Sequence, residues 1–202
     1  MKNALFGFND GTEYSDEVFQ GLELREKAAG SARFYGCVFK NCELTAFTFR
    51  SCRFTDCRFE SCNLSLAKVT GSSFSNTSFL SSKLTGVNWA EAAWPAIRLP
   101  GRLLFEDCVL NACSFFGVQL RGARLRKCLA RDADFREADL SGADLTHTDF
   151  AGSLFGKTNL SGANLDQARN YAIRISDNKV KDAKFSMPEA MALLYCLDIK
   201  II

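Results

Sequence analysis

A unit of five residues recurs through most of this chain, and it is clearest over residues 133–145, which read ADFREADLSGADL. The first position of each unit is a small residue, and the second is often Asp or Asn. The third is a large apolar residue, and the last two are suited to a turn. We call the large apolar residue the centre. Because side chains alternate in an extended segment, the centre and the small residue two places before it point the same way. The other three positions face outward, so the repeat separates an interior from a surface.

This period predicts a solenoid, because a unit of five residues cannot fold alone and must stack on copies of itself. If four units close one coil of about twenty residues, every fourth centre should stack. One extra residue at Pro100-Gly101 interrupts the count and predicts a bulge near residues 100–101. With that bulge, the predicted core ladder contains Phe34, Phe54, Phe74, Trp94, Phe115, Phe135 and Phe155.

At this repeat the chain resembles the pentapeptide-repeat family, whose fold is a right-handed quadrilateral β-helix. The resemblance covers residues 32–185 and implies an all-β solenoid. Unlike several members of the family, this sequence is expected to have no long loop inserted between its coils. At the parallel-strand spacing of about 4.8 Å, the coils would form a rod on the order of 40 Å long. We therefore expect an N-terminal cap at residues 1–30, a β-helix at 31–185 and a C-terminal segment at 186–202.

The C-terminal segment carries the signature of an α-helix. Ser186 and Glu189 are spaced as a capping box, and Pro188 suits the first turn. The helix would either cap the solenoid or cap it and also form a homodimer, and its apolar surplus favours the dimer. The predicted dimer interface contains Met191, Leu193, Leu194, Leu197 and Ile199.

Eight of the nine cysteines occupy the small inward position, where other units place Ala, Ser or Thr. Cys is a good small buried residue, and the spacing of five is the repeat itself, so core packing is the favoured interpretation. Disulfides that join Cys37 to Cys57 or Cys42 to Cys62 are the alternative. The sequence contains no C-x-x-C pair, which would have indicated a metal site.

Nothing in the sequence indicates catalysis. The only histidine, His147, faces outward, and no phosphate-binding or dinucleotide-binding motif is present. A packed interior would leave no pocket, so we expect a protein that is not an enzyme and has no cofactor. No stretch resembles a signal peptide or is apolar enough to span a bilayer, so we expect a cytoplasmic protein without a membrane.

Charge divides the chain into two parts although the formal net charge is only +2. Residues 31–100 hold eight basic and four acidic side chains, whereas residues 131–168 hold three basic and seven acidic ones. Aspartates that precede a centre are either an acidic partner-binding surface or the repeat's own preference, and consecutive ones fall on consecutive sides of a coil. The candidate partner-binding residues are Asp132, Asp134, Glu137, Asp139, Asp144, Asp149 and Phe116.

The tail FSMPEAMALLYCLDI, with GVNW and WP near the middle, resembles one branch of the family: AlbG, McbG, MfpA and the Qnr proteins, AlbG most closely. The resemblance implies a cytoplasmic homodimer, joined at its C-terminal ends, that imitates duplex DNA. Such a protein binds DNA gyrase or another type II topoisomerase and protects it from quinolone or peptide antibiotics. This sequence departs from the branch in its charge, because a DNA mimic should be strongly acidic.

Two other functions stay open. The near-neutral charge also fits a pentapeptide-repeat interaction scaffold with an unrelated protein partner. A basic belt at Arg102–Lys127 could bind an acidic ligand. Direct nucleic-acid binding is not favoured, because basic and acidic residues are mixed along the sequence and outward aromatic residues are few.

Overall fold

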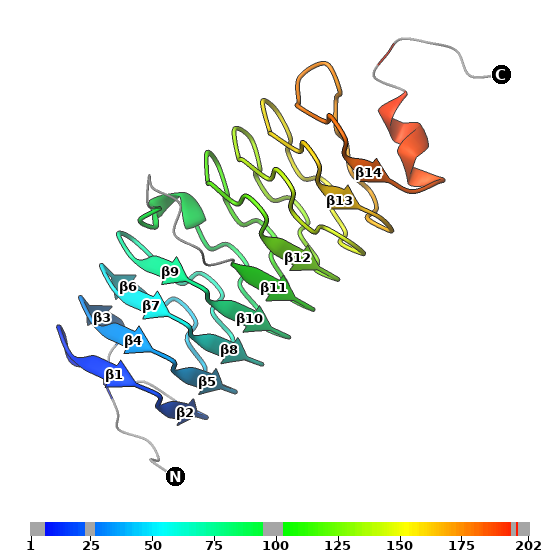
Figure 1. The fold of residues 1–202 in the computed structure, drawn as a ribbon. Helices are drawn as coiled ribbons and strands as arrows, with labels where there is room; N and C mark the ends of the chain where they lie inside the picture. The colour runs from blue at the N-terminus through cyan, green and yellow to red at the C-terminus, as the bar shows by residue number, and fades with distance from the viewer. Residues whose placement is uncertain (1–6, 23–26, 95–102, 195–196, 198–202) are drawn as a thin grey trace.

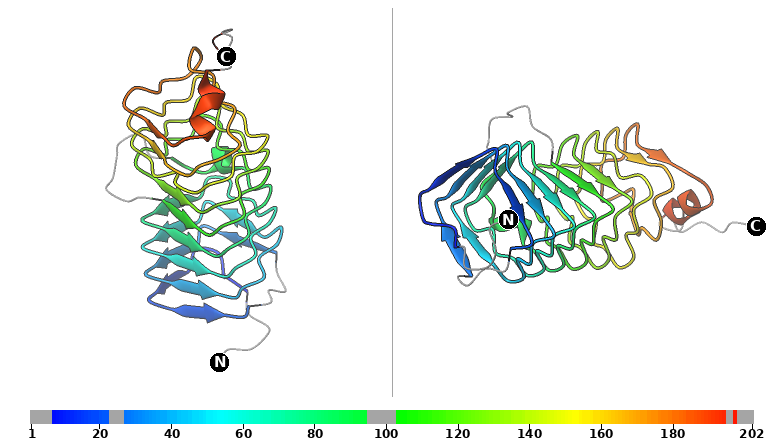
Figure 2. Two further views of the ribbon diagram at one scale, coloured as in Figure 1. Left: turned by 90° about the vertical axis from the view of Figure 1, so that its right-hand side faces the viewer. Right: turned by 90° about the horizontal axis from the view of Figure 1, so that it is seen from below.

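The computed structural model is a rod of stacked coils with β1 at one end and the C-terminal helix η2 at the other (Figure 1). It describes residues 7–22, 27–94, 103–194 and Leu197. Two further views show that the coils wind around one common axis (Figure 2). The predicted all-β solenoid, a right-handed quadrilateral β-helix, is confirmed.

Each coil has four sides, and the strands are short because every side holds one centre. The first side holds β1 (Glu13–Ser15), β4 (Arg33–Tyr35), β7 (Arg53–Thr55) and β9 (Ser73–Ser75). The second holds β2 (Val18–Gln20), β5 (Val38–Lys40), β8 (Arg58–Glu60), β10 (Ser78–Leu80), β11 (Leu104–Glu106), β12 (Arg124–Arg126), β13 (Asn164–Leu165) and β14 (Lys184–Phe185). The fourth holds β3 (Ala28–Gly30), β6 (Thr48–Arg50) and a 3-10 helix, η1 (Trp89–Glu91). The third side is joined by single bridges such as Glu43 to Asn63.

The predicted offset of twenty residues holds through the first coils, and it stacks like side chains on one another. Phe34 pairs with Phe54 and Phe54 with Phe74, and the ring centroids lie 4.8 and 5.0 Å apart in nearly parallel planes. The second side stacks Phe39 on Phe59 at 4.4 Å. Burial of these rings, each worth about 1.5–3 kcal/mol, supplies most of the core.

The break near residue 100 is larger than the sequence predicted. Phe79 pairs with Phe105, and Trp89 stacks on Phe115 with centroids 6.1 Å apart. Both offsets are twenty-six residues, so one coil carries six extra residues rather than one, and they fall between Ala93 and Leu104. The predicted one-residue bulge near residues 100–101 is therefore wrong, and the expectation of no long loop between coils falls on the same stretch. Residues 95–102 lie outside the described residues.

This insertion also corrects the core ladder. Phe34, Phe54 and Phe74 occupy the first side, with Trp94 following at the same offset. Phe115, Phe135 and Phe155 instead continue the fourth side, above Trp89. An insertion of one unit plus one residue moves every later centre to the neighbouring side. The seven residues predicted to form one ladder therefore belong to two ladders, one on the first side and one on the fourth.

The solenoid begins earlier than the predicted boundary at residue 31. Strands β1, β2 and β3 already pair in register with the next coil, as Tyr14 with Phe34 shows. The open end of this first coil is filled by Phe8, which is 1% exposed and meets the rings of Tyr14, Phe19 and Phe34 edge-on. One aromatic ring thus covers the end of the aromatic interior.

The C-terminal segment differs from the predicted α-helix. Its described part is a five-residue 3-10 helix, η2 (Glu189–Leu193), and Pro188 at its N-cap makes no side-chain capping bond. The Ser186 hydroxyl accepts the N–H of Gln167, and the Glu189 carboxylate accepts the N–H of Asn170. The two polar side chains therefore serve the exposed edge of the last coil rather than the helix, because that edge has no further coil to pair with.

The eight described cysteines are buried free thiols, and their side chains also act as hydrogen-bond donors. Cys57 and Cys62 donate to the carbonyls of Phe34 and Phe39 one coil below, with S···O distances of 3.3 Å. Contact with Cys37 and burial both raise the pKa of Cys57, so it keeps its proton. The sequence interpretation of packing alone missed this bond, although Ser and Thr at equivalent positions were a signal for it.

Candidate protein-binding surface

The four aspartates that precede consecutive centres lie on four different sides of the rod. Bridges to the neighbouring coils place Asp139 on the first side, Asp144 on the second, Asp149 on the third and Asp134 on the fourth. They therefore circle one coil and form no acidic strip along the rod.

Each of these carboxylates closes its own turn. Asp139 accepts the N–H of Ser141, and Asp144 accepts that of Thr146, each two residues ahead. Asp134 and Asp149 do the same for Arg136 and Ala151. Aspartate commonly stabilises a turn in this way, which accounts for its recurrence in the repeat. Much of the acidic character predicted for partner binding is therefore engaged in structure.

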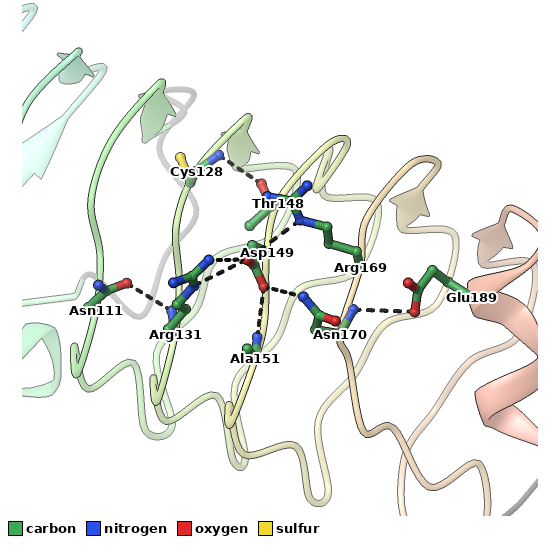
Figure 3. A network of polar contacts seen from close by, with 9 residues as sticks. All are labelled: Asn111, Cys128, Arg131, Thr148, Asp149, Ala151, Arg169, Asn170 and Glu189. Atoms are coloured by element: carbon green, nitrogen blue, oxygen red, sulfur yellow. Dashed lines mark hydrogen bonds and ion pairs between the residues drawn. The ribbon is translucent and has the colours of Figure 1, made fainter.

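Asp149 is the centre of a polar network on the third side (Figure 3). Its side chain is 2% exposed, and its carboxylate accepts bonds from Arg131 at 2.8 and 3.1 Å and from Asn170 at 2.9 Å. Arg169 adds an ion pair at 3.5 Å. Burial opposes ionisation, but the bonds from Asn170 and Arg131 outweigh it and lower the pKa of Asp149 to about 2. Asn170 in turn meets Glu189, so the network links η2 to the last coils.

Several of the predicted partner-binding residues meet on the fourth side of the C-terminal coils. Phe116 and Leu154 are 44% and 49% exposed there, and on the coil between them Asp134 is in register with Ser114 and with Leu154. Asp132 and Glu137 occupy the two corners of the same side, both with positive φ. We call this set the Phe116 surface: Phe116, Asp132, Asp134, Arg136, Glu137 and Leu154.

Arg136 organises the Phe116 surface. Its guanidinium binds both oxygens of Asp134, at 2.7 and 2.9 Å, and lies 5.8 Å from the centroid of the Phe116 ring. The bond from Arg136 lowers the pKa of Asp134. Lys157 pairs with Glu137 at 3.6 Å. Arg136 is not among the residues predicted from the sequence, although its offset of twenty residues from Phe116 places the two side by side on adjacent coils. The result is an apolar and aromatic centre with mixed charges around it.

The predicted dimer residues lie at the end of the rod. Met191, Leu193 and Leu194 are half-buried, and Leu193 packs against the core. Leu197 is 43% exposed and Met187 is 67% exposed. Ile199 lies outside the described residues. An apolar surface is thus present at this end, around η2.

The described coils have a side-chain-filled interior. One small internal gap is lined only by apolar residues, among them Val69, Phe74 and Trp89. His147 is exposed at a corner. Within the described ranges, no group of three His, Cys, Asp or Glu side chains could hold a metal ion. The same ranges contain no helix with the length and apolarity needed to cross a bilayer.

Comparison with known proteins gives a family and a fold. A family model described as a pentapeptide repeat region matches residues 32–104, and one for pentapeptide repeats in eight copies matches residues 113–152 and 145–169. Together these segments make up more than half of the 202 residues. No curated protein sequence matches the chain.

Solved structures match over nearly the whole length. One trypsin-treated variant of QnrB1, a plasmid-mediated fluoroquinolone resistance protein, is 19% identical with a TM-score of 0.76, covering 98% of this chain and 96% of its own. A second is 18% identical with a TM-score of 0.63, covering 97% and 100%. HetL, a pentapeptide-repeat protein involved in heterocyst differentiation regulation in the cyanobacterium Nostoc sp. strain PCC 7120, is 16% identical with a TM-score of 0.41, covering 90% and 86%.

Proposed function

Because this chain belongs to the pentapeptide-repeat family, we propose that it is a non-enzymatic, cytoplasmic protein-binding rod that protects a type II DNA topoisomerase, DNA gyrase above all, from inhibitors. The observation that carries the proposal is the likeness of the rod to variants of a fluoroquinolone resistance protein over 97–98% of this chain. The C-terminal tail and the tryptophan region, which resemble the gyrase-protecting branch, add support from the sequence.

We assign partner contact to the Phe116 surface. Interfaces between proteins are enriched in aromatic residues and Arg at their centre and are polar at the rim. Phe116, Arg136 and Leu154 supply such a centre, and Asp132 and Glu137 supply the rim. The ion pair between Arg136 and Asp134 holds the guanidinium over the ring, which reduces the ordering cost on binding.

The surface of this protein does not support imitation of DNA by negative charge alone. A duplex carries one negative charge per about 1.7 Å of its axis. Here the aspartates at 134, 144 and 149 are paired with arginines, and Asp139 is bonded to Ser141 and Asn159. We therefore propose recognition through shape and an apolar centre, with the acidic groups of residues 131–168 in a secondary role.

The test is a DNA gyrase supercoiling assay with and without ciprofloxacin or albicidin. Wild-type protein at micromolar concentration should restore supercoiling in the presence of at least one inhibitor. The double variant F116A/L154A should lose at least tenfold in potency, whereas V18A, which alters another exposed apolar residue at the far end, should behave as wild type. Absence of both inhibition and rescue by the wild type would refute gyrase protection and favour the scaffold with an unrelated partner, which the near-neutral charge supports.

We also propose a homodimer joined at the C-terminal ends, through Met191, Leu193, Leu194, Leu197 and Ile199. The exposed apolar side chains of Met187 and Leu197 at that end support it. The variant M187E/L197E should reduce the solution mass from twice 22.4 kDa to 22.4 kDa, and V18E should leave it unchanged. Light scattering measures both, and a wild-type protein of single mass at high micromolar concentration would contradict the dimer.

A further inference from the structure

Basic side chains gather on the fourth side of the N-terminal coils and at its corner with the first side. Arg50 ends β6 on the fourth side, and Arg53 begins β7 on the first side three residues later. Lys68 lies on the next coil at the start of the same fourth side, bridged to Thr48, the first residue of β6. We call Arg50, Arg53 and Lys68 the basic edge.

The three cations of the basic edge are exposed. Among the residues that the structure describes, none of the three has a carboxylate within 4 Å. The nearby carboxylates are engaged elsewhere: Glu91 with Thr70 and Asn88, Asp56 with Asn76, and Asp10 with the N–H of Gly30.

Three other basic residues of these coils are neutralised by ion pairs. On the second side Lys40 and Arg58 both pair with Glu60, at 3.2 Å each. On the first side Arg33 pairs with Glu13 at 3.3 Å. The basic edge therefore differs from Arg33, Lys40 and Arg58 in having positive charge without an ion-pair partner among the described residues.

The packing of the coils also brings positive charges close to one another. Arg33 and Arg53 are register partners in adjacent strands, and like charges directly opposite one another destabilise a sheet. Residues 27–85 hold eight basic and three acidic side chains, so the surrounding field is positive as well. A bound polyanion would relieve this repulsion.

We propose that the basic edge binds the phosphate backbone of a nucleic-acid duplex. Planar guanidinium groups match phosphate oxygens in pairs, and two of the three cations are arginines. Successive coils repeat at about 4.8 Å, so the cations lie close enough to contact several phosphates of one strand. The one strongly exposed apolar residue beside these cations, Leu66, precedes Lys68 by two residues, and a single such side chain is not the clustered apolar centre of a protein interface.

This proposal reverses the sequence expectation for a physical reason. Along the chain, basic and acidic residues alternate, which argued against nucleic-acid binding. Closure of the coil places residues 50 and 53 at one corner with residue 68 on the adjoining fourth side, and turns Asp56 and Glu60 toward other corners and sides. The inference does not depend on the proposed gyrase protection.

The experiment measures binding of a fluorescein-labelled 20-base-pair duplex by anisotropy at 50 and 200 mM NaCl, with the full chain. Neutralising three phosphates predicts a slope of about −2.7 in log K against log salt, hence about 40-fold weaker binding at 200 mM. The variant R50Q/R53Q/K68Q should bind at least tenfold more weakly at 50 mM. The control K179Q/K181Q/K184Q removes the same charge from the last coil and should keep wild-type affinity.

Three results would overturn the proposal: no salt-dependent binding of the duplex at 50 mM and 100 μM protein, equal losses in both triple variants, or binding of poly-glutamate without binding of the duplex. Circular dichroism checks that each variant is folded. If the triple variant is unfolded, R53Q alone should reduce the slope by about 0.9. An unchanged slope in R53Q would also overturn the proposal.

Discussion

The N-terminal and C-terminal coils build the same four-sided rod with different chemistry. In the N-terminal coils the centres are mostly Phe, and Cys, Ser or Thr at the inward position donates to the corner carbonyl one coil below, as Cys57 does to Phe34. In the C-terminal coils Leu centres and inward Ala prevail. There the carbonyls of Leu120 and Leu140 instead accept the N–H groups of Ala123 and Ala143 in tight turns.

The difference shows that a corner carbonyl can take its donor from either of two places, and the Phe135 carbonyl accepts from both, the Ala138 N–H and the Thr158 hydroxyl. A buried peptide carbonyl without a partner is costly, so a corner without its own turn bond needs a side chain from the next coil. The residue twenty-three positions ahead therefore helps to decide the conformation of a corner. Local sequence alone does not contain this information.

The largest expected effect on stability comes from truncating a buried centre, and it compares the Phe core of the N-terminal coils with the Leu core of the C-terminal coils. Phe54→Ala should lower the free energy of unfolding by about 4 kcal/mol and Leu140→Ala by about 3, because both side chains are fully buried but only Phe54 loses parallel ring contacts. Guanidinium chloride unfolding measures both values. A larger loss for Leu140→Ala would show that stacked rings do not distinguish the N-terminal coils.

A second prediction concerns the buried carboxylate of the C-terminal coils. Asp149→Ala should cost about 2 kcal/mol at pH 7, whereas Asp139→Ala, which removes a more exposed carboxylate, should cost less than about 1. Urea unfolding of the three proteins at fixed pH makes the comparison.

The pH dependence of the Asp149 contribution follows from its lowered pKa. A folded-state pKa of about 2, against 3.8 ordinarily, stabilises the fold above pH 4, and this stability is lost as pH falls toward 2. The difference between wild type and D149A should therefore shrink over that window. A difference that stays constant from pH 5 to pH 2 would exclude ionised Asp149 as its source.

A third prediction separates the two ways of closing a corner. Cys57→Ala should cost about 1 kcal/mol because the Phe34 carbonyl loses its donor, and Cys57→Ser should keep most of the stability. In the C-terminal coils, Ala143→Ser should give no gain, since the carbonyl of Leu120 already accepts the N–H of Ala123. Thermal unfolding of all three is the measurement, and stabilisation by A143S would argue against the two-donor account.

The smallest expected effect on stability is at Val69, which interrupts the column of aromatic centres on the fourth side. Val69 lines the apolar gap beside Trp89, so Val69→Ile should raise the free energy of unfolding by about 0.5–1 kcal/mol. Val118→Ile, at a tightly packed inward position of a later coil, should be destabilising instead. Melting temperatures that move in the same direction for both would show that the gap is not available space.

Much of the candidate site could be placed from the repeat, but its composition could not. The period correctly separates Asp134, Asp139, Asp144 and Asp149 onto four sides. It does not reveal that Arg131 and Arg136 neutralise two of them, because side-chain pairing depends on rotamers and on neighbours a coil away. The C-terminal capping box shows the same limit, since Ser186 and Glu189 found donors on the last coil.

The sequence by itself determined that this chain is a solenoid of four-sided coils, because a bulky apolar residue every five positions leaves no other way to bury all of them. Only the tertiary structure decided which side each later centre occupies. The length of the insertion between Ala93 and Leu104 sets that register, and a break in the period does not state how many residues leave the coil. The same closure decided which charges meet across coils, since residues twenty positions apart become neighbours only when the coil is complete.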